Sequence, residues 1–195
     1  MTKRLFVALK PPRAALDELS GAVQPLRDDA PAARWTRLDS WHLTLEFLGA
    51  VEEPGIVVLM QRLDLVAGQH GPIELSITGG GRFGDRVLWA GITGDLEPLR
   101  RLARAVRAAA LEAGVQVDSR PYRGHLTLAR GAPGINLRPL VERLRQFSGS
   151  AWAATELYLI ESRLGAGPDG TALYETCAHW PLSSRLQQLR GPLRR

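Results

Sequence analysis

The chain has 195 residues, 45% of them hydrophobic and 23% charged, which excludes an extensively disordered chain and predicts one folded unit with a substantial core. A single cysteine, Cys177, excludes an intrachain disulfide and a cysteine-rich metal site, and no apolar run approaches the roughly 20 residues of a membrane span. We therefore expect a cytoplasmic protein that contacts no membrane, and the net charge of +5 favours a polyanionic partner such as RNA.

The first half of the chain is expected to alternate between strands and helices. Apolar, β-forming residues predict the strands, and apolar residues three or four positions apart predict the helices. In chain order, the pattern predicts a strand at 4–9, a helix opened by Pro11 and Pro12, a short extended piece at 34–36, a strand at 42–48, a helix between Pro54 and Gly68, and a strand at 73–77. The three glycines at 79–81 then predict a flexible turn.

The second half repeats this alternation. It is expected to contain strands at 87–92 and from 125 onward, helices near 97–113 and 137–147, closing strands near 155–161 and 172–180, and a basic tail at 183–195. On the helix at 97–113, Arg100, Arg104 and Arg107 share a face. That face is interpreted as solvated, with contact to RNA as the alternative.

One tetrapeptide, His-Leu-Thr-Leu, occurs at 42–45 and again at 125–128. Successive side chains of a strand point to opposite faces, so each copy should bury its leucines and present its histidine and threonine together. The same alternation places Glu46 on the histidine face and Phe47 among the leucines, in the core.

Two such strands facing each other would form a cleft with two imidazoles and two hydroxyls, His42, Thr44, His125 and Thr127. This set suits acid–base chemistry on a small anionic group. The other two histidines, His70 and His179, lie in no repeated context and are expected on the surface or packed.

The repeat extends beyond the tetrapeptide. His42 and His125 are 83 positions apart, as are Thr44 and Thr127, and the same offset superimposes the flanking predicted helices and strands. We therefore expect an α+β fold of two pseudo-twofold-related lobes, each a mainly antiparallel sheet with helices outside, around a central cleft. The expected domain is 1–182, with an internal repeat at about 4–78 and 86–161.

These motifs resemble the 2H phosphoesterase superfamily, whose members carry one His-x-Thr/Ser motif in each lobe of a duplicated fold. The chain is most similar to the RNA 2',3'-cyclic phosphodiesterases, also called 2'-5' RNA ligases. The resemblance covers nearly the whole chain and rests on residues 4–9, 42–49, 86–91, 120–130 and 159–164. One departure is Gly124, where proline commonly precedes the second histidine.

The resemblance implies hydrolysis of RNA 2',3'-cyclic phosphate ends, or of cyclic nucleotides, to 2'-phosphomonoesters, with 2'-5' ligation as the reverse sense in some members. By matching position, His42 is the general acid and His125 the general base, and Thr44 and Thr127 contact the non-bridging oxygens. No metal and no cofactor is implied, and a monomer is the default expectation.

Three further residues are candidates for substrate binding. Arg130 follows the second motif and matches an arginine often found in the family, although strict alternation would place it on the leucine face unless the strand ends or twists near Gly131. Tyr122 and Arg123 precede His125 and are assigned to the base or the RNA backbone, with a purely structural role as the equal alternative.

Two other functions stay open. A non-catalytic RNA- or nucleotide-binding module could use the same scaffold, although a binder has no need of an acid and a base in both lobes. A histidine metal enzyme is the other alternative, although two histidines and the single nearby acid, Glu46, make a poor ligand set.

Overall fold

The computed structural model describes residues 1–132 and 134–184. Its strands are β1 (Thr2–Leu9), β2 (Arg34–Trp35), β3 (Leu43–Glu52), β4 (Ile73–Phe83), β5 (Val87–Gly94), β6 (His125–Arg130), β7 (Trp152–Ala154), β8 (Glu156–Arg163) and β9 (Leu173–Pro181). Its helices are α1 (Arg13–Asp29), α2 (Glu53–Gln69), α3 (Leu96–Glu112) and α4 (Arg138–Leu144), with 3-10 turns at Leu38–Ser40 and Pro168–Gly170. Most of the predicted tail, from 185 onward, lies outside the described residues.

The strands form two antiparallel sheets. Sheet I is four-stranded in the order β3-β1-β8-β9, and sheet II is five-stranded in the order β2-β6-β5-β4-β7. In sheet I the central β1 lies between β3 and the late strand β8, and in sheet II the corresponding β5 lies between β6 and the early strand β4. Each half of the chain therefore contributes a strand to the other half's sheet, which gives the α+β fold its pseudo-twofold character.

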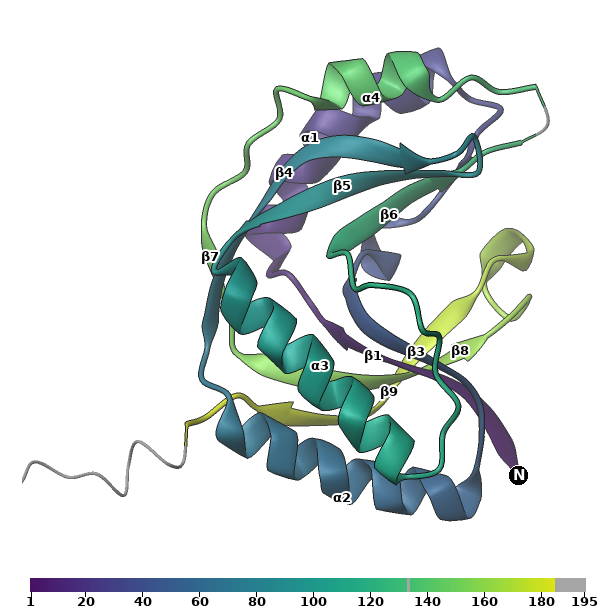
Figure 1. The fold of residues 1–195 in the computed structure, drawn as a ribbon. Coiled ribbons are helices and arrows are strands. Elements are labelled where there is room, and N and C mark those ends of the chain that lie inside the picture. Colours follow the sequence, from purple (N-terminus) through teal and green to yellow (C-terminus); the bar gives the residue numbers. More distant parts are fainter. Residues whose placement is uncertain (133, 185–195) are drawn as a thin grey trace, which may run out of the picture.

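The helices cover the outer faces of the sheets in the same exchanged way. Helices α2 and α3 pack against each other and on sheet I, whereas α1 and α4 lie on sheet II (Figure 1). Helix α1 points its buried residues, Leu16, Leu19, Val23 and Leu26, inward at the spacing that the sequence predicts. None of the helices within the described part of the chain combines the length and apolar composition needed to cross a membrane.

The two faces of sheet I have different surroundings. Leu5, Val7 and Leu9 of β1 belong to the main hydrophobic core, whereas Phe6 and Ala8 point to the opposite face. There they pack with Ile160 of β8 and form a separate small cluster. This second face carries the first histidine.

The predicted turn at 79–81 is wrong, because these glycines lie inside β4. A Cβ atom on Gly81 would come within 2.2 Å of the Trp89 ring, and one on Gly80 within 2.6 Å of the Leu144 side chain. Glycine is required here so that Trp89 can lie across the strand. The register shifts between Thr78 and Gly80, where Gly79 has a φ of 54°, so the run contains a bulge and not a loop.

Candidate active site

The two repeated histidines are held by the same local contact. His42 immediately precedes β3, and its Nδ1 lies 2.7 Å from the carbonyl oxygen of Ser40. His125 begins β6, and its Nδ1 lies 2.8 Å from the carbonyl oxygen of Arg123. A carbonyl oxygen can only accept, so Nδ1 carries the proton in both rings. Each Nε2 is then left to accept a proton when the ring is neutral and to donate one when it is charged.

Aromatic rings fix the orientation of each imidazole. His42 stacks on Phe6 of β1 with ring centroids 4.6 Å apart, and Tyr174 of β9 contacts it edge-on at 5.2 Å. His125 meets the ring of Phe83 edge-on at 4.9 Å and lies 6.2 Å from that of Trp89. An aromatic residue of the central strand therefore lies beside each histidine, Phe6 in sheet I and Trp89 in sheet II.

Burial makes both imidazoles weaker bases than free histidine. Desolvation lowers the pKa of His42 to about 4, which exceeds the opposing effect of the Ser40 carbonyl. The charges of Lys10 and His125 lower the pKa of His42 further, so the two imidazoles are close enough to interact although they belong to different sheets. Desolvation also lowers the pKa of His125, with a smaller contribution from the charge of Arg123.

The two threonines take matching places beside the histidines. Thr44 pairs with Ala8 of β1, and Thr127 pairs with Trp89 of β5, so each lies on the face that carries its histidine. Both are partly exposed. Within the described residues, neither hydroxyl is taken up by a hydrogen bond to another side chain, so both are available as donors to a bound group.

A short segment connects the two histidine strands directly. Trp41, the residue before His42, donates from its indole nitrogen to Thr36 Oγ1 at 2.8 Å. Thr36 Oγ1 lies 2.8 Å from the carbonyl oxygens of both Thr127 and Leu128 in β6. This chain of contacts sets the position of one half of the site relative to the other.

Both histidine strands bulge one residue after the threonine. In β3 the register passes from Thr44 opposite Ala8 to Glu46 opposite Val7, which leaves Leu45 without a partner. In β6 it passes from Thr127 opposite Trp89 to Ala129 opposite Leu88, which leaves Leu128 without one. A bulge adds one residue to a strand and therefore reverses which face the following side chains take.

The bulge in β3 corrects two predictions made from strict alternation. Phe47 was expected in the core, but it pairs with Phe6 on the histidine face and is 59% exposed, and Leu48 is buried in its place. Glu46 was expected on the histidine face, but it pairs with the core residue Val7. Its charged neighbours are Arg107 and Asp118, and desolvation raises the pKa of its carboxyl.

The bulge in β6 acts on Arg130 in the same way. Arg130 pairs with Val87, one residue beyond the core pair of Ala129 and Leu88, and is exposed. It therefore shares the face of His125 and Thr127, and takes in sheet II the place that Phe47 takes in sheet I.

The candidates just before His125 lie in different surroundings. The Arg123 guanidinium lies 4.5 Å from the centroid of the Trp89 ring and 5.7 Å from that of Phe83, beside the second histidine. The Tyr122 ring instead packs against the main core, where burial raises its pKa. Its buried hydroxyl has no hydrogen-bond partner among the described residues, which favours the structural alternative for Tyr122.

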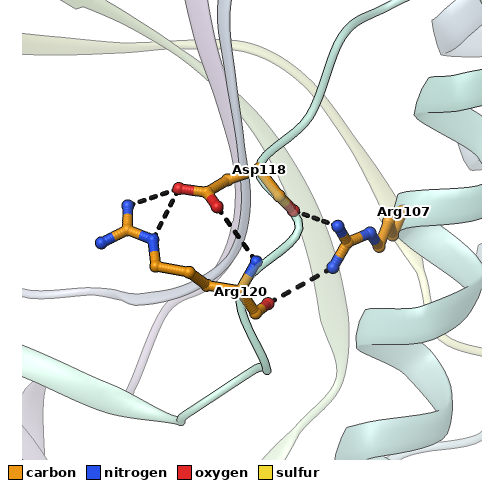
Figure 2. A network of polar contacts seen from close by, with 3 residues as sticks. All are labelled: Arg107, Asp118 and Arg120. Carbon is orange, nitrogen blue, oxygen red and sulfur yellow. Dashed lines mark hydrogen bonds and ion pairs between the residues drawn. The ribbon is translucent and has the colours of Figure 1, made fainter.

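The loop that leads to His125 is anchored to α3 (Figure 2). Arg107 donates to the carbonyl oxygens of Asp118 and Arg120, and the Asp118 carboxylate accepts from the backbone nitrogen of Arg120 at 3.0 Å. Two other arginines of this helix, Arg100 and Arg104, form ion pairs with Glu97. The arginine face is thus engaged in contacts within the protein, and Arg107 in particular positions the approach to β6.

Several residues of the site were missed from the sequence. Phe6, Phe83, Trp89 and Tyr174 surround the imidazoles, but none belongs to the repeated tetrapeptide. Alternation along β1 could have placed Phe6 opposite the leucines. The contact of Phe83 and Tyr174 with the histidines depends on strand order, which the sequence does not contain.

The remaining histidines have different partners. His70 Nδ1 lies 2.8 Å from the carbonyl oxygen of Val66, and His179 Nδ1 lies 3.0 Å from Glu156 Oε1 on β8. Over residues 1–132 and 134–184, no three His, Cys, Asp or Glu side chains are grouped so that they could hold a metal ion.

Comparison with known proteins gives a consistent family. The profile of the 2'-5' RNA ligase superfamily matches residues 11–166. An RNA 2',3'-cyclic phosphodiesterase of Geobacillus stearothermophilus is 28% identical over 91% of this chain and 56% of its own length, so the chain spans little more than half of that relative. Another, of Aeropyrum pernix, is 30% identical over 72% of this chain and 83% of that protein.

The fold agrees with this result. The crystal structure of Escherichia coli LigT complexed with 3'-AMP superimposes with a TM-score of 0.73 at 25% identity, over 93% of this chain and 99% of LigT. Together with the profile match and the paired His-x-Thr strands, this shows that the chain belongs to the 2'-5' RNA ligase superfamily.

Proposed function

We propose that the protein hydrolyses the 2',3'-cyclic phosphate ends of RNA to 2'-phosphomonoesters by acid–base catalysis with two histidines. The observation that carries this proposal is the equivalence of the two imidazoles. In each ring Nδ1 donates a hydrogen bond to the backbone carbonyl oxygen two residues earlier, and each ring shares its strand face with a threonine. The names of the similar proteins support the substrate class.

In the proposed reaction, the cyclic phosphate lies between the two Nε2 atoms. His125 Nε2 removes a proton from water, whose oxygen attacks phosphorus. The bond between phosphorus and the 3'-oxygen breaks, and His42 Nε2 donates a proton to that oxygen. The products are a 2'-phosphomonoester and a 3'-hydroxyl, and proton exchange with solvent returns both imidazoles to their starting forms.

The other polar groups stabilise charge in this scheme. Thr44 and Thr127 donate to the non-bridging oxygens, and Arg130 provides a permanent positive charge on the same face as Thr127. An anionic phosphate between the rings raises the pKa of both histidines, because it favours their charged forms. That shift brings the pKa of His42, which is low in the protein without substrate, toward the range in which the ring can act as an acid.

A 5'-hydroxyl of a second RNA could replace water as the nucleophile. The same proton transfers would then join the two ends through a 2'-5' linkage, so ligation is the natural companion of the proposed hydrolysis. We further propose that residues 1–182 act as a single bilobal unit with repeats at about 4–78 and 86–161, as a monomer in the cytoplasm.

The proposal is tested with RNA that ends in a 2',3'-cyclic phosphate, incubated with and without EDTA, with the product identified by ³¹P NMR. We expect a 2'-phosphomonoester in both samples. Binding without turnover would instead identify an RNA-binding module, and turnover abolished by EDTA would identify a metal enzyme.

A further inference from the structure

A second polar group lies on the same face of sheet I as His42. Lys10 follows the last residue of β1, and its Nζ lies 2.8 Å from Thr176 Oγ1 and 4.6 Å from the centroid of the Tyr158 ring. Beside it, Glu156 Oε2 accepts from the Tyr158 hydroxyl at 2.5 Å and Glu156 Oε1 lies 3.0 Å from His179 Nδ1. We call these five residues, Lys10, Glu156, Tyr158, Thr176 and His179, the Lys10 cluster.

Strand register places this cluster relative to the catalytic histidine. Phe6, on which His42 stacks, pairs with Ile160, which pairs with Thr176. Neighbouring strands are about 4.8 Å apart, so Thr176 and the ammonium bound to it lie about 10 Å from Phe6 across the sheet. The charge of Lys10 also reaches His42, whose pKa it lowers.

The ammonium of Lys10 is held in place by neutral groups and not by an ion pair. Thr176 and the Tyr158 ring are neutral. The Glu156 carboxylate acts on Lys10 from a greater distance, and its two oxygens contact Tyr158 and His179. No carboxylate among the described residues lies within ion-pair distance of Lys10, which is exposed. By contrast Lys3, the only other lysine, forms an ion pair with Glu161 at 2.9 Å.

We infer that Lys10 binds the internal phosphodiester that neighbours the reacting cyclic phosphate of the RNA. An immobilised cation without an ion pair, on the same sheet face as His42 and about 10 Å from the Phe6 on which His42 stacks, suits the next negative charge along a single strand. Tyr158 and Thr176 fix the lysine, and Glu156 with His179 fixes Tyr158. The inference rests on the proposed function and adds to it a preference for oligonucleotides over mononucleotides.

The test compares adenosine 2',3'-cyclic phosphate with the dinucleotide ApA that ends in a 2',3'-cyclic phosphate. Lys10→Met should lower the ratio of kcat/KM for the dinucleotide over the mononucleotide by roughly tenfold, because it removes a charged hydrogen bond to phosphate. The salt dependence of log KM for the dinucleotide should also become shallower by about 0.7. Lys3→Met is the matched control and should leave the ratio unchanged, and Lys10→Arg should largely restore it.

A dinucleotide with a neutral methylphosphonate in place of the internal phosphodiester makes the pairing explicit. With this substrate, kcat/KM of the wild type should fall roughly tenfold. The kcat/KM of Lys10→Met should change little on the same substitution, because this variant already lacks the cation. Equal losses in the two proteins, or an equal effect of Lys10→Met on both natural substrates, would overturn the inference.

Calorimetric binding of the product analogue ApA with a terminal 2'-phosphate separates this inference from the proposed function. The affinities of the wild type and of Lys10→Met are compared for this ligand with its natural internal phosphodiester and with the methylphosphonate. Absent turnover in the wild type, with Lys10-dependent binding of the internal phosphate, would contradict the function alone. Normal turnover with no effect of Lys10→Met on that binding would contradict the inference alone.

Discussion

At the scale of single residues, the two imidazoles are neutral groups held in apolar surroundings. His42 lies between Phe6 and Tyr174, and His125 lies near Phe83 and Trp89. Such surroundings disfavour the charged ring until an anion arrives. In the proposed mechanism, binding of an anionic substrate therefore favours protonation of His42.

The low pKa of His42 predicts a loss of stability in acid. The folded pKa of about 4 is below the value of about 6.5 in the unfolded chain, so the unfolded state binds the proton first. The neutral ring's contribution is fully present above pH 6.5 and is lost as the pH falls toward 4, up to about 3 kcal/mol.

Urea unfolding between pH 7 and pH 4 measures this effect. His42→Gln should show a smaller decrease of the unfolding free energy over that range than the wild type. Thr44→Ala alters the same strand without removing a titratable group and should keep the wild-type decrease. A His42→Gln protein with the wild-type pH dependence would contradict the low pKa assigned to the buried His42 ring.

The threonines test the stabilisation of charge on phosphate. Thr44→Ala and Thr127→Ala should each fold normally and lower kcat by about 10²–10³, the effect of removing one donor to a developing charge. Thr155→Ala, an exposed position between β7 and β8, serves as the control. Full activity in either site variant would remove that threonine from the mechanism.

At the scale of elements, the paired bulges decide which side chains reach the site. A regular β3 would bury Phe47 and present Glu46, whereas the bulge at Leu45 exposes Phe47 and turns Glu46 toward Arg107. The corresponding bulge at Leu128 brings Arg130 to the histidine face.

Stability measurements on β3 test this register. Phe47→Ala should lower the unfolding free energy by no more than about 1 kcal/mol, because the ring is largely exposed. Leu48→Ala should cost about 2–5 kcal/mol, as expected for a buried leucine. The reverse order, obtained from denaturant unfolding, would show that the strand continues without a bulge.

Many of the helices and strands could be predicted from the sequence, because the signals that define them are local. Helix α3 was expected at 97–113 and lies at Leu96–Glu112, since its apolar spacing and the following Gly114 define it. The bulges and the β-strand conformation of Gly80 and Gly81 were not predicted, because they depend on neighbouring strands and on Leu144 of the helix α4 packed on the sheet. Alternation alone was therefore reliable only as far as the threonine of each motif.

At the scale of the whole molecule, strand exchange brings the two halves of the site together. Each sheet contains strands from the beginning and the end of the chain, and Thr36 and Trp41 connect the start of β3 to β6. The sequence predicted two lobes and a pseudo-twofold, but not which strands cross between them. That information lies in the pairing of β4 with β5 and of β8 with β1.

The net charge of +5 predicts how RNA binding responds to salt. Basic side chains that contact phosphates release counterions, so the affinity for an RNA oligomer should fall as salt rises and should exceed that for a mononucleotide. Fluorescence anisotropy over a range of salt concentrations measures the slope. An affinity for RNA that does not change with salt would contradict a role for the basic surface.

The most direct test of the account is kcat/KM for adenosine 2',3'-cyclic phosphate in His42→Ala, His125→Ala and the double variant, with His70→Ala as control. Each single variant should lose about 10²–10⁴-fold, and the double variant little more, because the two imidazoles act as a unit. His70→Ala should retain wild-type activity. Turnover at the normal rate without His42 or without His125 would contradict the two-histidine mechanism.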